Sequence, residues 1–166
     1  MSHRRIALLS AGLTLALVPT ASAASVDDHL FAVNATRANL AEIAAARLAL
    51  DKSDDAGVRA YARHMVADHK TAQTKLAAIA KATNTTLPKQ PSAAQRAEAA
   101  RLAKLSGEAF DRNYLRRQVV DHRKALATML LELDVGTVSS LRNFAATTAP
   151  VVRMHLAMAQ RTRATL

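Results

Sequence analysis

The sequence predicts an all-α fold: an antiparallel four-helix bundle with an additional short helix between its second and third long helices. Apolar residues recur at three- and four-residue steps through four long stretches of the chain, which is the pattern of a helix with one buried face. The 166 residues include only four Gly and four Pro, so few points interrupt these stretches. No segment alternates polar and apolar residues for long enough to form a strand.

The first 23 residues have the pattern of a cleavable signal peptide. Arg4 and Arg5 precede an uncharged run over residues 6–18, and Ala21 and Ala23 supply the small side chains that a signal peptidase reads. This run is shorter than the about 20 residues that a membrane-spanning helix needs. We therefore expect cleavage near Ala23, no membrane anchor after processing, and a single domain over residues 24–166 located in the periplasm or secreted.

The first long helix is predicted over residues 26–51. Ser53 to Asp55 then offer N-cap side chains for a second long helix that ends near Lys81. Residues 84–92 contain two prolines and form the one long loop. The side chains expected to face the core from these two helices are Leu30, Asn34, Ala38, Ala41, Ala45 and Leu48, followed by Val58, Ala62, Met65, His69, Leu76 and Ala80.

A short helix is predicted over residues 93–104, and the third long helix over 107–133 after the N-cap candidate Ser106. A tight reversal around Gly136 leads to the fourth long helix over 138–163, in which we expect Pro150 to produce a kink or a loosened turn. The side chains expected to face the core here are Leu115, Val119, His122, Leu126, Met129 and Leu133, followed by Leu141, Ala145, Thr148, Val152, His155 and Ala159.

Composition narrows the classes of function. The formal charge is +10, of which Arg4 and Arg5 contribute two, so the domain itself is basic and we expect at most weak association with anionic envelope surfaces. The few aromatic residues lie at core spacing and leave no stacking platform, so nucleic acid is not an expected partner. The absence of Cys excludes thiol chemistry, and no nucleophile arrangement, phosphate loop or nucleotide fingerprint is present.

The most informative pattern is an internal repeat of ten residues. Residues 61–70 align without gaps on residues 114–123, and both copies read Tyr-x-Arg-x-x-Val-x-Asp-His-basic. Counting along antiparallel helices places His69 and His122 at nearly the same height, both on the inward stripe, so we expect the two imidazoles to face one another. The preceding residues, Asp68 and Asp121, point about 100° away, toward the edge of the stripe, where Arg or Tyr could meet them.

Two further residues complete a candidate site. Glu42 lies at the edge of the first helix's apolar stripe, and His155 lies on the inner face of the last helix, at a height that Pro150 leaves open. One carboxylate and three imidazoles suffice for a divalent transition metal such as Zn, Cu, Fe or Ni. The candidate ligands are Glu42, His69, His122 and His155, with Asp68, Asp121, Asp111, Tyr61 and Tyr114 as outer or structural partners.

Two alternatives to metal binding stay open. In one, the same residues are buried polar groups bonded to one another, and an Asp-His pair fixes the register of the helices. In the other, the histidines form a pH-responsive pair, since imidazole titrates near neutrality. The sequence therefore favours a non-enzymatic binding or envelope-stress accessory protein with a structural Asp-His core, with a periplasmic metal-binding protein as the alternative.

Several motifs resemble the bacterial exported family catalogued as domain of unknown function 4142. They are Met65-Val66-Ala67-Asp68-His69, then Leu105-Ser106-Gly107 with Phe110-Asp111 and Tyr114, then Asp121-His122, then Ala149-Pro150 with His155-Leu156. The resemblance covers residues 26–163 and implies a ferritin-like helical bundle and export, but no established activity. Val66 and Val119 stand where di-iron bundles carry the Glu of a Glu-x-x-His pair, so a ferroxidase or oxygenase site is not expected.

Overall fold

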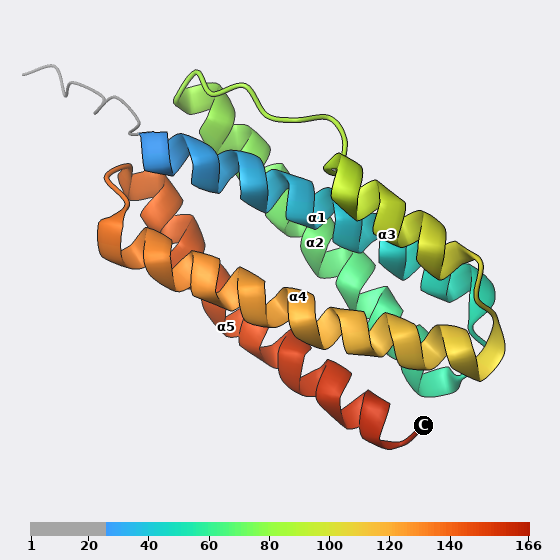
Figure 1. Cartoon of the computed structure of the whole chain (residues 1–166). Coiled ribbons are helices and arrows are strands. Elements are labelled where there is room, and N and C mark those ends of the chain that lie inside the picture. The colour runs from blue at the N-terminus through green and yellow to red at the C-terminus, as the bar shows by residue number, and fades with distance from the viewer. Residues whose placement is uncertain (1–25) are drawn as a thin grey trace, which may run out of the picture.

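The computed structural model describes residues 26–166, and the signal peptide expected over residues 1–23 lies outside this range. Within it the chain forms five α-helices and no strand, so the prediction of an all-α fold is confirmed (Figure 1). The helix ends agree with the predicted ones to within two residues. The helices are α1 (Val26–Lys52), α2 (Ala56–Ala82), α3 (Ala93–Ala103), α4 (Gly107–Val135) and α5 (Ser139–Ala164).

The four long helices surround one core. Helix α1 packs against α2 and α4, and α5 packs against α4 and α2, so each long helix contacts two others in a closed ring. The short helix α3 lies outside this ring, against α1 and α4 (Figure 1). None of the helices in the described range is both long and apolar enough to cross a membrane.

Two helices begin with side-chain capping bonds, the first of them within the predicted Ser53–Asp55 segment. The Asp55 carboxylate accepts a hydrogen bond from the Val58 amide at 2.8 Å and starts α2. Ser92 and Gln95 form a reciprocal capping box at the start of α3. Ser106 precedes α4 as predicted, but its side chain makes no capping bond, and the turn depends instead on Gly107, whose φ of +53° favours glycine.

The inward face of α1 differs from the predicted one. Its buried side chains include Phe31, Ala35, Asn39, Glu42, Ala46 and Ala49, each one residue after the member expected in the sequence stripe, whereas Leu30 is 49% exposed. A shift of one residue corresponds to a rotation of about 100°. Helix α1 is rich in alanine around its whole circumference, so its sequence pattern does not single out one face.

The core consists of two apolar clusters. One contains Tyr61, Met65, Phe110 and Tyr114 near the α1–α2 turn, and the other is built around Phe31, Leu76 and Phe144 near the α4–α5 turn. On each long helix, at least one buried or partly buried polar side chain lies between the two clusters. The buried or partly buried residues of this middle layer are Asn39, Glu42, His69, His122 and His155.

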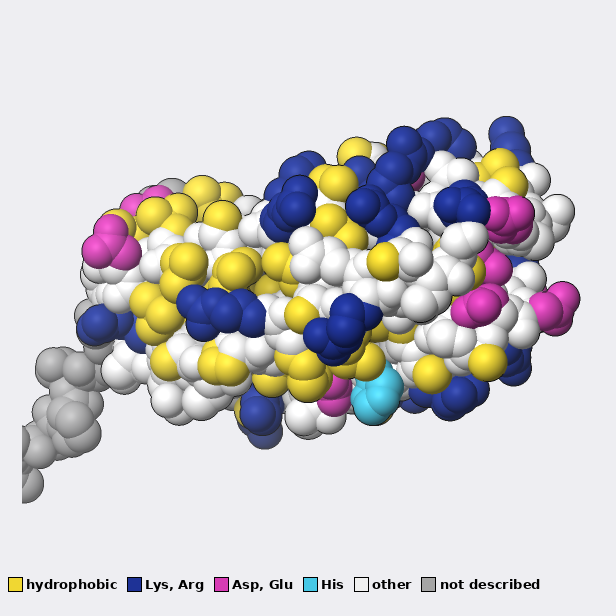
Figure 2. Space-filling model, turned by 90° about the horizontal axis from the view of Figure 1, so that it is seen from below, with side chains coloured by type: hydrophobic (Ala, Val, Ile, Leu, Met, Phe, Trp, Pro, Cys, Tyr) yellow, Lys and Arg dark blue, Asp and Glu magenta, His cyan; other side chains and the backbone are white. Residues whose placement is uncertain are grey.

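Basic side chains are spread over one face of the molecule (Figure 2). Figure 2 shows Lys and Arg distributed along the length of one face, interspersed with apolar side chains.

Helix α5 runs without interruption through Pro150, whose side chain is exposed.

The α4–α5 turn is held by the N-terminal turn of α1. The buried carboxylate of Asp28 accepts hydrogen bonds from the amides of Thr137 and Val138 at 3.0 and 3.1 Å, and from the Thr137 hydroxyl. Glu132 lies beside it and is 3% exposed. A Cβ on Gly136 would lie 2.5 Å from the Glu132 carbonyl oxygen, so this close turn requires glycine.

Glu132 should make stability depend on pH. Burial and the neighbouring Asp28 raise the pKa of Glu132 to about 7, above its usual 4.5. Because the folded chain binds this proton more tightly, the group's contribution to the free energy of unfolding is fully present below about pH 4.5 and is lost as the pH rises through about 7. We expect the urea midpoint to fall between about pH 5 and about pH 8, and Glu132→Gln to reduce that fall.

The matched control for this titration is Glu108→Gln, on an exposed residue of the same helix. This variant should retain the pH dependence of the wild-type protein. An identical change in midpoint for the wild-type protein and Glu132→Gln would show that Glu132 does not titrate in this range.

Candidate metal centre

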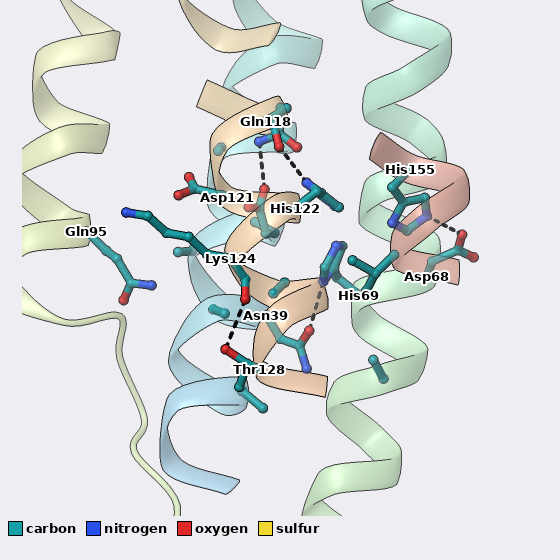
Figure 3. Close-up of a pocket in the computed structure, with 18 of the residues that line it drawn as sticks. Asn39, Asp68, His69, Gln95, Gln118, Asp121, His122, Lys124, Thr128 and His155 are labelled. Atoms are coloured by element: carbon teal, nitrogen blue, oxygen red, sulfur yellow. Dashed lines mark hydrogen bonds and ion pairs between the residues drawn. The ribbon is translucent and has the colours of Figure 1, made fainter. Parts of the chain in front are cut away.

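Three histidines from three helices meet in the middle polar layer. His69 on α2, His122 on α4 and His155 on α5 have ring centroids 5.8, 5.5 and 5.4 Å apart (Figure 3). His122 and His155 are each 1% exposed, and His69 is partly buried. One ring nitrogen from each residue can be chosen so that all three atoms lie within 4.8 Å of one another. The predicted approach of His69 to His122 is therefore present, and His155 joins them at the same level.

One nitrogen of each ring is already bonded. His69 Nδ1 lies 2.8 Å from Asn39 Oδ1, and His122 Nδ1 lies 2.9 Å from the carbonyl oxygen of Gln118. His155 Nε2 lies 2.8 Å from a carboxylate oxygen of Asp68 (Figure 3). Each partner atom is an acceptor, so each of these ring nitrogens carries the proton and donates it. A neutral ring then has a lone pair on its second nitrogen.

The second nitrogen of every ring is buried and without a hydrogen-bond partner: His69 Nε2, His122 Nε2 and His155 Nδ1. Leaving a buried polar atom unpaired costs about 1–3 kcal/mol. Three such lone pairs in one place require a cation or a set of donors. The arrangement of an imidazole that donates to an acceptor on one side and offers a lone pair on the other is the usual arrangement around a metal-binding histidine.

Burial favours the neutral form of His69 and His155. Desolvation lowers the pKa of His69 well below 6.5, and the neighbouring His122 and His155 lower it further. Desolvation also lowers the pKa of His155, although the hydrogen bond to Asp68 opposes this. Because the protonated form is disfavoured, the lone pairs remain available near neutral pH, and neutral imidazole is the form that binds metals.

A chain of polar groups links Glu42 to the same layer. The Tyr61 hydroxyl donates to Gln118 Oε1 at 2.9 Å, and Gln118 Nε2 donates to Glu42 Oε2 at 2.7 Å. Burial raises the pKa of the Glu42 carboxyl, while His122 and Gln118 lower it. Glu42 thus lies within the electrostatic reach of His122, but it is not one of the three residues whose ligand atoms converge.

The other residues predicted as outer or structural partners differ in the contacts that they make. Asp121 forms the expected pair with an arginine, Arg117, at 2.7 Å. Asp68 does not meet Arg or Tyr; it bonds to His155, because α5 and not a basic side chain lies beside that edge of α2. Asp111 and Tyr114 are buried, and Asp111 Oδ1 and the Tyr114 hydroxyl have no hydrogen-bond partner.

Asn39 is the site residue that the sequence pattern missed. It lies three residues before Glu42 on the inward face of α1, but the predicted stripe of that helix was rotated by one residue. With the correct rotation, Asn39 and Glu42 would have appeared together as a polar interruption of an apolar face.

A cavity of about 220 Å³ adjoins the histidines. Its walls come from all five helices and are mostly apolar, with alanines of α1 on one side and the three histidines on another. A second hollow of about 290 Å³ shares Asn34, Gln95, Arg117, Asp121 and Lys124 with the cavity and lies on its solvent side, between α1, α3 and α4.

The Tyr61–Gln118–Glu42 chain should contribute measurably to stability. Gln118→Leu leaves a buried carboxylate and a buried hydroxyl unpaired, so we expect the free energy of unfolding to fall by about 2–4 kcal/mol. Tyr61→Phe breaks only the outer bond and should cost about half as much. Chemical denaturation of both variants, with Gln160→Leu on the exposed side of α5 as control, tests this order. Equal losses for Gln118→Leu and Gln160→Leu would contradict it.

Comparison with known proteins gives a family and a fold. The model of the family described as Domain of unknown function (DUF4142) matches residues 15–162. The crystal structure of a DUF305 fragment from Deinococcus radiodurans is similar, with a TM-score of 0.76 and 19% sequence identity, covering 86% of this chain and 99% of that chain. At this identity the likeness shows the fold alone. No curated protein matches the chain. Because the family model spans most of its length, the protein belongs to the DUF4142 family.

Proposed function

We propose that this protein is an exported, non-enzymatic helical-bundle protein that binds one divalent transition-metal ion through His69 Nε2, His122 Nε2 and His155 Nδ1. The observation that carries the proposal is a cluster of three histidines, each of which can offer a ring nitrogen within 4.8 Å of the other two and each of which has one buried ring nitrogen without a partner. The second nitrogen of each ring is held by an acceptor, which fixes both the orientation of the ring and the atom that it offers.

The spacing suits a metal ion after a small adjustment. At a metal–nitrogen distance of about 2.0–2.1 Å, three nitrogens of a tetrahedral site lie about 3.3 Å apart. Bringing atoms now within 4.8 Å to that spacing moves each nitrogen by less than about 1 Å, which ring rotation can supply. Three neutral imidazoles suit Zn²⁺, Cu²⁺ or Ni²⁺, and Fe²⁺ binds such a set more weakly.

Glu42 supplies negative charge near the ion. Its carboxyl lies close enough to His122 for that residue to lower the pKa of Glu42, and Gln118 fixes one of its oxygens. A bound cation favours the ionised form that burial of this carboxyl otherwise opposes. In this proposal the three histidines are the ligands, and Glu42 is the fourth ligand only if its side chain turns away from Gln118.

The proposed architecture is a ferritin-like antiparallel four-helix bundle with α3 added outside. Its support is the closed ring of contacts among the four long helices and the short α1–α2 and α4–α5 connections. Export is supported by the signal-peptide pattern of residues 1–23. The basic surface then favours weak association with anionic envelope components.

A structural Asp-His core is the second candidate. The bond between Asp68 on α2 and His155 on α5 favours it, because such a pair fixes the relative height of two neighbouring helices. The two candidates differ in what the free nitrogens do. In a structural core they have no ligand, and added metal changes nothing.

Metal binding is tested on tag-free protein by isothermal titration with Zn²⁺, Cu²⁺ and Ni²⁺ and by absorption spectra of the Co²⁺ form. We expect one ion per chain and a higher melting temperature with metal, since a ligand at 100 times its Kd stabilises the folded state by about 2.7 kcal/mol. His69→Ala, His122→Ala and His155→Ala should each weaken binding by more than about 100-fold. The control His64→Ala, on an exposed residue of α2, should have no effect.

The internal repeat provides a sharper control. Asp68→Ala removes the acceptor that orients His155, and we expect a loss of about 10–100-fold in metal affinity. Asp121→Ala changes the equivalent residue of the second copy, which bonds to Arg117 and not to a ring, and should leave the affinity unchanged. Failure of all these metals to bind or to change the melting temperature would reject metal binding and leave the structural Asp-His core.

A further inference from the structure

The cavity beside the histidines is small and has mostly apolar walls. The α1 wall is built from Ala35, Ala38, Ala41 and Ala45, whose small side chains leave space between α1 and α4 that α3 covers. Deeper in, Met129 and Phe144 extend the apolar lining. At about 220 Å³ the cavity lies below the 300–1,000 Å³ of sites for drug-sized ligands, so it suits a small molecule with an apolar body.

Two unpaired hydrogen-bond donors line the same cavity. Asn39 Oδ1 bonds to His69, which turns the amide nitrogen away, and that Nδ2 atom is buried without a partner. The hydroxyl of Tyr114 is also buried without a partner, and burial, with a further contribution from Glu42, raises the pKa of Tyr114, so the hydroxyl retains its proton. Both groups can be satisfied by an acceptor oxygen on a ligand.

The entrance is positively charged. The outer hollow between α1, α3 and α4 is lined by Arg37, Arg117 and Lys124, with Asp121 as the one acidic side chain among its lining residues. Figure 3 shows Lys124 and Asp121 on α4 and Gln95 on α3 extending into this entrance. A basic entrance with apolar walls raises the local concentration of anions and increases their rate of entry.

We propose that this cavity binds a small organic monocarboxylate. The carboxylate fills the open position of the ion held by the three histidines, in a cavity whose lining residues offer the unpartnered donors Asn39 Nδ2 and the Tyr114 hydroxyl. Its apolar body lies against the alanines of α1. This inference rests on the proposed metal site, because three protein ligands leave a coordination position open, as they do in metal sites that take exogenous ligands.

The test uses the full chain loaded with Co²⁺, whose visible absorption reports changes in the coordination sphere. Butyrate and benzoate are the probes, titrated spectroscopically and by calorimetry. We expect saturable binding with a changed Co²⁺ spectrum, and weaker binding of acetate, which lacks most of the apolar body. A spectrum unchanged by all three probes, in a protein that binds the metal normally, overturns this inference and leaves the proposed function standing.

Cavity variants separate specific binding from general anion effects. Ala38→Leu fills the cavity and should abolish probe binding while metal affinity is retained, and the same substitution at the exposed Ala44 of α1 is its control. Tyr114→Phe keeps the shape of the ring, removes the free hydroxyl, and should weaken probe binding by about three- to tenfold. Its control is Thr74→Val, which removes an exposed hydroxyl of α2 outside the cavity lining.

The entrance is tested through rates. Lys124→Gln should slow the association of butyrate and reduce its dependence on salt, whereas Arg123→Gln, on the exposed neighbouring residue, should not.

Probe binding that survives Ala38→Leu places the carboxylate elsewhere and overturns the inference. Failure of the protein to take up any metal overturns the proposed function, and this inference with it.

Discussion

The structure depends on a layer of hydrogen-bonded imidazoles in the middle of an otherwise apolar core. His69, His122 and His155 come from three helices, and each is fixed by one acceptor. Rotating α2 or α5 by one residue would carry its ring out of the layer and separate it from an acceptor on another helix, Asn39 of α1 or Asp68 of α2. The layer therefore fixes the rotation of α1, α2 and α5 relative to one another, while the apolar clusters on either side supply most of the stabilising burial.

The histidine layer also lowers the stability of the fold, and a purely structural role does not explain this loss. A core built for stability would replace three unpaired nitrogens by apolar side chains of similar volume, since each unpaired group costs about 1–3 kcal/mol. The cavity beside the rings adds a further cost in lost packing contacts. Unsatisfied groups and cavities of this kind are concentrated at functional sites, where a ligand satisfies them.

The two copies of the internal repeat lie in different surroundings, and equivalent residues therefore have different partners. Asp68 and Asp121 occupy equivalent positions, yet Asp68 bonds to His155 and Asp121 to Arg117. Tyr61 donates to Gln118, whereas the hydroxyl of Tyr114 has no partner. The difference arises because α2 is flanked by α5, while α4 also faces α3 and the cavity. The α2 copy thus forms bonds to both α4 and α5, whereas the α4 copy leaves a buried hydroxyl unpaired beside the cavity.

The sequence by itself determined the five helices, their ends to within two residues, and the inward orientation of His69 and His122, because helical periodicity and capping are local properties. It did not determine the rotation of α1, since an alanine-rich helix has no dominant face, and so Asn39 was missed. The height of His155, the choice of Asp68 as its partner and the cavity under α3 were decided by tertiary structure. These three features depend on how helices that are distant in sequence pack together, and local sequence patterns do not predict this packing.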